Sequence, residues 1–190
     1  MDYSSYLRVL LSVWIGLGLG QMVQAFHRLA RFKGTVRWDW LPLVWAGFSF
    51  LMVVQTWWAY FELLQSPLWV NLFAFLLPLS VFVLLYLLCA SALPDVSRAD
   101  ATDVVDLTAF HFGQRLYFFA LWAVLLTLAL VVSRLVRGSF AWVEDGFRVA
   151  GIAAAVTLAR SDARNVHGVL TVLAVLAMSV YIVLFTLRLP

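Results

Sequence analysis

Polar side chains inside long apolar segments are the first residues of this chain that could do chemistry. Gln21, Gln24, Gln55 and Thr56 all lie within hydrophobic runs. A glutamine amide in hydrocarbon needs a hydrogen-bond partner, and once paired it contributes only about 0.6 to 2 kcal/mol. These four residues therefore mark either tight helix contacts or the lining of a cavity or pore. We expect Gln24 and Gln55 to meet inside the protein, because they lie on helices joined by a short loop.

A second group of candidates is charged and lies near the ends of predicted helices. Glu144 and Asp145 come four and three residues before Arg148, so they lie on its face of a helix and can neutralise it. Glu62 ends another predicted helix on the same side of the membrane, where a carboxylate can reach water. This outer charged cluster is either the salt-bridged start of a helix at the interface or a charged vestibule.

The three histidines fall towards the opposite side of the membrane, among arginines that suit lipid headgroups. The headgroup or ligand candidates are His27, Arg31, His111, Arg115, Arg164 and His167. Imidazole is a common metal ligand, but the sequence holds no His-x-x-x-His or His-Glu-x-x-His motif. We therefore expect interfacial histidines, with a haem or metal ligand set as the alternative. We predict no metal, no cofactor and no catalytic residues.

Composition places nearly the whole chain in a membrane. Of the 190 residues, 64% are hydrophobic and only 12% are charged, whereas soluble domains carry roughly 25% charged residues. The mean hydropathy is +0.95, and apolar runs long enough for a roughly 30 Å hydrocarbon core recur from end to end. The predicted fold class is an all-α integral membrane protein, with a single transmembrane domain over 1–190.

Hydropathy predicts a bundle of about six transmembrane helices. The predicted segments are 5–27, 40–63, 68–93, 114–134, 140–159 and 167–188. The fifth is the weakest, because charged residues occupy its first half and small residues are frequent from Gly146 to Ala159. Trp40 and Trp142 support two of the boundaries, since the membrane interface favours indole rings. The longest polar connection, 93–113, is predicted to contain an amphipathic helix on the membrane surface.

A short internal similarity bears on the architecture. Arg28-Leu-Ala-Arg31 at the end of the first segment resembles Arg134-Leu-Val-Arg137 at the end of the fourth. One interpretation is a pair of inverted three-helix repeats, which is the plan of many transporters. The other is that Arg-Leu-x-Arg is simply a common end to a membrane helix.

Charge and small residues suggest orientation and assembly. Basic residues favour the cytoplasmic side of a membrane, and the loop from Arg28 to Arg37 holds the largest basic cluster, so both termini are predicted to lie outside. Gly16 and Gly20 are one helical turn apart, a pattern that lets a second helix approach closely. We therefore predict a homo-oligomer.

The polar groups inside helices and the short loops also bear on function. Our preferred hypothesis is a small channel or transporter of the bacterial inner (cytoplasmic) membrane, acting on a small ion or solute, because polar groups lie inside helices and the loops are short. One alternative is a membrane-embedded enzyme or redox protein acting on a lipid or quinone. Another is a non-catalytic assembly or sensor subunit. The net charge of +3 is too small to indicate nucleic acid and fits contact with a lipid bilayer.

Overall fold

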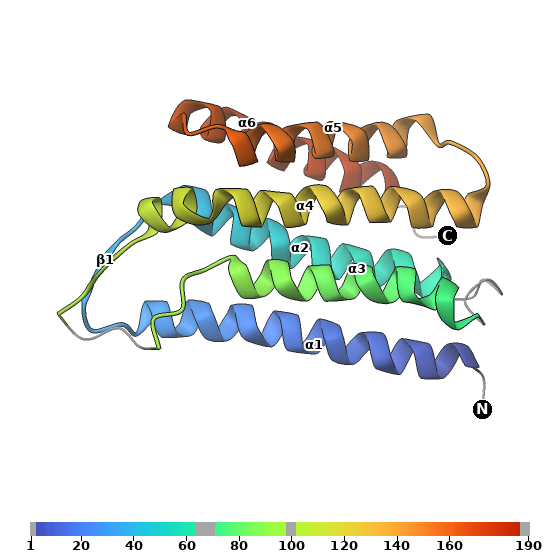
Figure 1. Ribbon diagram of the computed structural model, residues 1–190, viewed down its shortest axis with the longest axis horizontal. Helices are drawn as coiled ribbons and strands as arrows, with labels where there is room; N and C mark the ends of the chain where they lie inside the picture. The colour runs from blue at the N-terminus through green and yellow to red at the C-terminus, as the bar shows by residue number, and fades with distance from the viewer. Residues whose placement is uncertain (1–2, 64–70, 98–101, 187–190) are drawn as a thin grey trace.

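The computed structural model describes residues 3–63, 71–97 and 102–186. Within these ranges the chain forms six α-helices, two short strands and one π-helical turn. They are α1 (Tyr3–Ala30), β1 (Thr35–Arg37), α2 (Trp40–Leu63), α3 (Leu72–Ser91), β2 (Val104–Asp106), α4 (Leu107–Arg137), α5 (Trp142–Arg160), α6 (Arg164–Tyr181) and η2 (Ile182–Thr186). The helices run along the long axis of the molecule, and α1 begins where α6 ends, opposite the small sheet (Figure 1).

Five of the described helices are long and apolar enough to cross a membrane: α1, α2, α3, α4 and α6. The chain is therefore a multi-pass membrane protein with an all-helical bundle. The fifth helix, α5, does not meet this criterion, and it carries Glu144, Asp145, Arg148 and Arg160 within 19 residues. Its place in the bundle depends on neighbours that neutralise those charges.

The boundaries of α4 differ most from the predicted segment 114–134. The helix begins at Leu107 because the Asp106 carboxylate accepts a hydrogen bond from the Ala109 N–H at 2.9 Å, which satisfies a free donor of the first turn. It ends at Arg137, and the next residue, Gly138, has φ of 69° and donates its N–H to the Arg134 carbonyl. Glycine adopts this left-handed conformation without strain, so it suits a helix end.

The connection before α4 contains a strand where an amphipathic helix was expected. Residues 104–106 form β2, which pairs in parallel with β1 so that Thr35 lies opposite Val104 and Arg37 opposite Asp106. A side chain at Gly34 would lie 2.6 Å from the Asp103 carbonyl oxygen, so the close approach of the two segments requires glycine there. The prediction of a surface helix is therefore wrong for this part of the connection.

The two halves of the bundle pack differently. In the first half, α1 packs mainly on α3, whereas in the second half α4 packs mainly on α5. Gly18 lies at the α1–α3 contact, since a Cβ atom added there would lie 3.4 Å from the Cα of Tyr86. Two inverted three-helix repeats would share one packing pattern, and these two halves do not.

Candidate functional site

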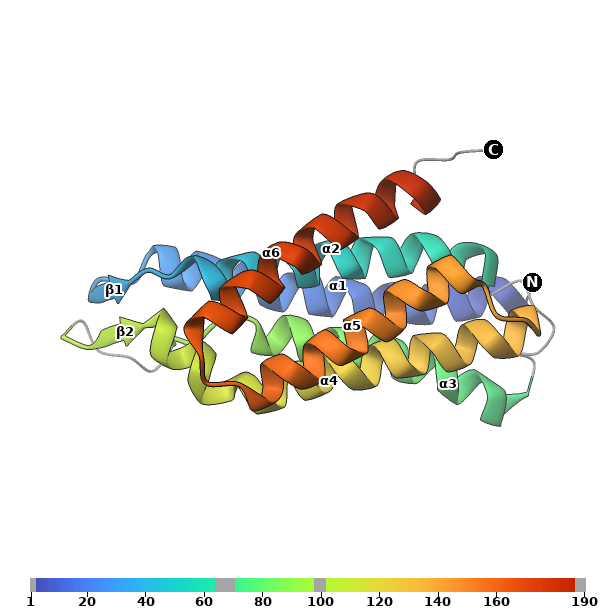
Figure 2. The ribbon, with the colours of Figure 1, turned by 90° about the horizontal axis from the view of Figure 1, so that it is seen from above.

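A cavity of about 360 Å³ lies among α2, α4, α5 and α6. Much of its wall on α5 and α6 consists of small residues, namely Ala150, Gly151, Ala154, Ala174 and Ala177. The axis of α6 also crosses the bundle obliquely and diverges from α5 towards its C-terminal end (Figure 2). Small side chains on a diverging helix leave the space between them unfilled. The volume falls in the range of about 300–1,000 Å³ that is typical of small-molecule sites.

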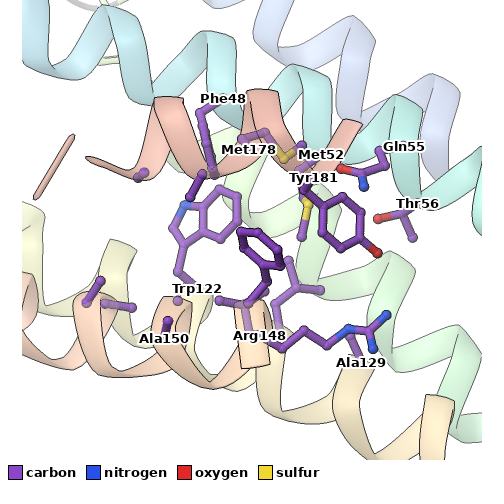
Figure 3. Close-up of a pocket in the computed structure, with 18 of the residues that line it drawn as sticks. Phe48, Met52, Gln55, Thr56, Trp122, Ala129, Arg148, Ala150, Met178 and Tyr181 are labelled. Atoms are coloured by element: carbon purple, nitrogen blue, oxygen red, sulfur yellow. The ribbon is translucent and has the colours of Figure 1, made fainter. Parts of the chain in front are cut away.

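The second helix supplies a polar edge to this cavity. Met52, Gln55, Thr56 and Tyr60 all line it, and their spacing places them along one side of α2. The close-up shows Gln55 and Thr56 grouped near Tyr181, with Trp122 on the other side of the cavity (Figure 3). The remaining lining is almost entirely aliphatic or aromatic, so the site favours a lipophilic molecule with a few polar groups.

Three buried polar atoms of the lining lack a hydrogen-bond partner among the described residues. They are the carbonyl oxygen of Gln55, the hydroxyl of Tyr60 and the indole N–H of Trp122. Leaving such a group buried and unpaired costs about 1–3 kcal/mol. The set comprises one acceptor, one donor and one hydroxyl that can do either. Each of these atoms has almost no exposed area, so a ligand in the cavity would reach them only after the side chains turn towards it.

Aromatic rings form the wall of the cavity nearest the start of α2. The indole N–H of Trp45 donates to the hydroxyl of Thr171 on α6 at 2.9 Å. The Trp45 ring packs edge-to-face on Phe119 at a centroid distance of 4.9 Å and on Trp122 at 5.7 Å. Edge-to-face pairs of this kind stabilise a packed arrangement by about 0.5–1.5 kcal/mol each. Trp45 therefore joins three helices at this side of the cavity.

The other end of the cavity meets a network of five charged side chains. Arg148 lines the cavity and binds Asp145 at 2.7 Å and also Glu144. Two arginines of α4 complete the network, since Arg137 contacts both carboxylates and Arg134 lies 3.9 Å from Asp145. Asp145 is fully buried, at 0% exposure. The arginines of α4 thus provide the neutralisation that α5 needs.

One further contact ties the sixth helix to this network. The hydroxyl of Tyr181, which lines the cavity, lies 3.3 Å from a carboxylate oxygen of Glu144. The predicted partner Glu62 lies near the end of α2, and its side chain falls outside the described residues. The outer charged cluster is thus built from α4, α5 and α6.

The candidate glutamines of the first helix are not part of the cavity. Gln21 and Gln24 are exposed on α1, and the side-chain oxygen of Gln24 accepts a hydrogen bond from Arg28 at 3.3 Å. The expected meeting of Gln24 with Gln55 is therefore wrong. The reason is that α1 turns its Gly18 face towards α3, which leaves the glutamines on the outside of the bundle.

Two of the three histidines meet inside the bundle. The Nε2 atom of His111 and the Nδ1 atom of His167 lie 3.0 Å apart, and both residues are buried. They are not the exposed headgroup contacts that the sequence suggested, whereas His27 and Arg31 are exposed on the first helix and the turn after it. No group of three or more potential metal ligands occurs among the described residues.

The arginines beside this histidine pair form ion pairs of their own. Arg164 binds the buried carboxylate of Asp39 at 2.9 Å, and Arg115 pairs with Asp162. Burial alone would raise the pKa of Asp39, but hydrogen bonds from Thr108 and the Leu41 N–H and the charge of Arg164 hold it below its ordinary value. Asp39 is therefore a carboxylate at neutral pH, and the bundle end with the sheet carries a second charged network.

Several residues of the cavity were missed by reasoning from the sequence. Tyr60, Trp122 and Tyr181 were not among the candidate residues. The informative signal was the run of small residues from Gly146 to Ala159, which weakened the fifth segment as a predicted helix but indicates space beside it.

Comparison of the chain with protein-family models, with curated proteins and with solved structures finds no match.

Proposed function

We propose that this protein is a small membrane transporter that holds a lipophilic solute in the cavity among α2, α4, α5 and α6. The observation that carries the proposal is a largely apolar cavity of about 360 Å³ between four helices, with Gln55, Thr56 and Tyr60 along one side. Apart from Arg148 at one end, which Glu144 and Asp145 neutralise, the lining is apolar and opposes hydrated ions, because a charge there loses its water without compensation. The cavity therefore supports a carrier of lipid-soluble molecules over an ion channel.

The setting of this transporter is part of the same proposal. We place it in the bacterial inner membrane as a homo-oligomer, with α1 starting and α6 ending on the outer side. The basic loop between α1 and α2 supports this orientation, since positive charge favours the cytoplasmic side. Gly16, which is exposed, and Gly20, which is half-buried, support contact between copies, because an added Cβ atom at either would meet no neighbouring atom within 4 Å.

Filling the cavity should abolish binding of a lipophilic probe. We expect Ala154→Phe to weaken the binding of Nile red, an uncharged fluorophore, at least tenfold, because the added ring occupies the space that the probe needs. Ala153→Phe is the matched control, since Ala153 is exposed one position away on α5. Probe fluorescence would be compared for the two proteins at equal detergent concentration. Equal affinities in the two variants would remove the cavity from the proposal.

Transport itself needs a separate measurement. Organic extraction of the purified wild-type protein, followed by mass spectrometry, identifies the solute that co-purifies with it. Proteoliposomes should then move this solute across the bilayer faster with wild type or Ala153→Phe than with Ala154→Phe. Identical rates for all three would contradict a transport role.

Gln55 is expected to lower the stability of the ligand-free protein. We expect Gln55→Leu to raise the free energy of unfolding of the ligand-free protein by about 1–2 kcal/mol, because an unpaired buried oxygen is removed. Gln114→Leu is the control, since its amide donates to the Ser91 carbonyl, and it should lower stability by about 1 kcal/mol. Unfolding in mixed micelles would measure both. A loss of stability in Gln55→Leu would show that Gln55 is structural.

A further inference from the structure

We propose that His111 and His167 form a proton-binding site, and that the proton taken up there weakens binding in the cavity. The first part stands on the geometry of the pair alone. The second part, the coupling, rests on the proposed function of the cavity.

The hydrogen bonds of the pair define where protons are held. The Nε2 atom of His167 lies 3.0 Å from the Ser161 carbonyl oxygen, which can only accept, so this nitrogen carries a hydrogen. A neutral imidazole then presents its other nitrogen as an acceptor. The Nδ1 of His167 therefore accepts from the Nε2–H of His111 at 3.0 Å. This leaves the Nδ1 of His111 as the nitrogen that takes a further proton.

Four charged groups face the pair, two of each sign. Asp39, before α2, and Arg164, on α6, act on His111, while Arg115, on α4, and Asp162, between α5 and α6, act on His167. Each arginine is already paired with one of the carboxylates. The surroundings are thus neutral in sum, so Asp39 and Asp162 favour an imidazolium while Arg115, Arg164 and burial oppose it.

The pair is buried, but exposed side chains lie next to it. The side chains of Asp162 and Arg164 are 78% and 54% exposed, so the charged network beside the pair reaches the surface. A void of about 10 Å³ is lined by His111 and Gln114. That is about the least space that holds one water molecule. A proton can therefore reach the pair without crossing the apolar core.

The same helix connects the pair to the cavity. His167 and Thr171 are one turn apart on α6, and Thr171 accepts the hydrogen bond of Trp45, which lines the cavity. Phe119 packs edge-to-face on both histidines and on Trp45. Anything that displaces α6 from α2 and α4 at the pair therefore also displaces the cavity wall.

A proton on the pair weakens this attachment of α6. The new imidazolium competes with Arg164 for Asp39, and Arg164–Asp39 is an ion pair that holds the start of α6 to the start of α2. The cavity between these helices then loosens. Because linkage is reciprocal, a proton that weakens solute binding is itself released when solute binds.

Nitrogen-15 NMR of histidine-labelled protein in nanodiscs tests the proton site. The chain has three histidines, so His27→Gln leaves only the signals of the pair. At high pH we expect both rings to carry hydrogen at Nε2, and on acidification both signals should shift together with uptake of one proton. Three outcomes would each overturn the site: the two rings titrate independently, either ring has a different tautomer, or the protein unfolds before the pair takes up a proton. His167→Gln should abolish the joint shift and leave a single signal that belongs to His111.

The affinity for Nile red tests the coupling in the same His27→Gln background. We expect the affinity to fall about fivefold or more as the pair becomes protonated, which is a typical coupling between two sites. In the His111→Gln and His167→Gln double variant, with its fold checked by circular dichroism, the affinity should be independent of pH. A constant or rising affinity on protonation of the pair would overturn the coupling while leaving the proton site intact. Absence of probe binding at every pH would instead refute the cavity, and the NMR titration would still decide the proton site.

Discussion

Asp145→Asn is expected to lower the free energy of unfolding by about 3–5 kcal/mol, the cost of breaking a buried ion pair. The carboxylate is fully buried and lies within 4 Å of Arg134, Arg137 and Arg148. It also accepts the N–H of Ala141 at 2.9 Å, at the start of α5. Asparagine keeps the shape of the side chain and an acceptor for that N–H. The loss of stability should therefore measure the effect of removing the charge. Without it, three arginines face a single carboxylate.

Asp95→Asn is the matched control for this measurement. Asp95 pairs with Arg28 at 3.3 Å, but its side chain is 69% exposed. Exposed pairs contribute at most about 1 kcal/mol because water and salt screen them. Reversible unfolding in mixed micelles would give both values. If Asp145→Asn costs no more than Asp95→Asn, the charged network does not hold α5 in the bundle.

Gly18→Leu should separate α1 from α3 and destabilise the protein by about 1–3 kcal/mol, as overpacking does in other cores. Even a Cβ atom at this position would lie 3.4 Å from the Cα of Tyr86 and 3.8 Å from the Cβ of Cys89. A leucine side chain has no space there. The change would be measured as a lower midpoint of unfolding, with wild-type helix content retained at low temperature.

The neighbouring glycines give the opposite expectation. Around Gly16 and Gly20, no heavy atom of the described residues lies within 4 Å of an added Cβ, apart from the helix itself. Leucine at both positions should leave the stability of the monomer unchanged. If this face contacts a second copy, the same double variant shifts the detergent-solubilised mass, measured by light scattering, towards the monomer. An unchanged mass would remove α1 from the proposed oligomer interface.

Hydropathy along the sequence identified the five described helices that are long and apolar enough to cross a membrane, because the transfer of a helix into hydrocarbon depends mainly on its own residues. It also predicted a sixth span at 140–159, where α5 does not meet this criterion. The boundaries of α2 agree with the predicted segment 40–63. The start of α4 was missed by seven residues, since its first turns carry His111 and Gln114 and continue the helix beyond the apolar run. Hydropathy detects the hydrocarbon-compatible part of a helix, and a cap such as Asp106 decides where the helix begins.

Only the tertiary structure decided which faces meet. Sequence periodicity showed that Gly16, Gly20 and Gln24 share a side of α1, but the side that packs is the one with Gly18. The pairing of His111 with His167 spans 56 residues, and no local pattern specifies it. The cavity likewise requires small residues on two helices together with the oblique course of α6. Such features depend on how all six helices pack at once, whereas a single segment records only its own polarity and period.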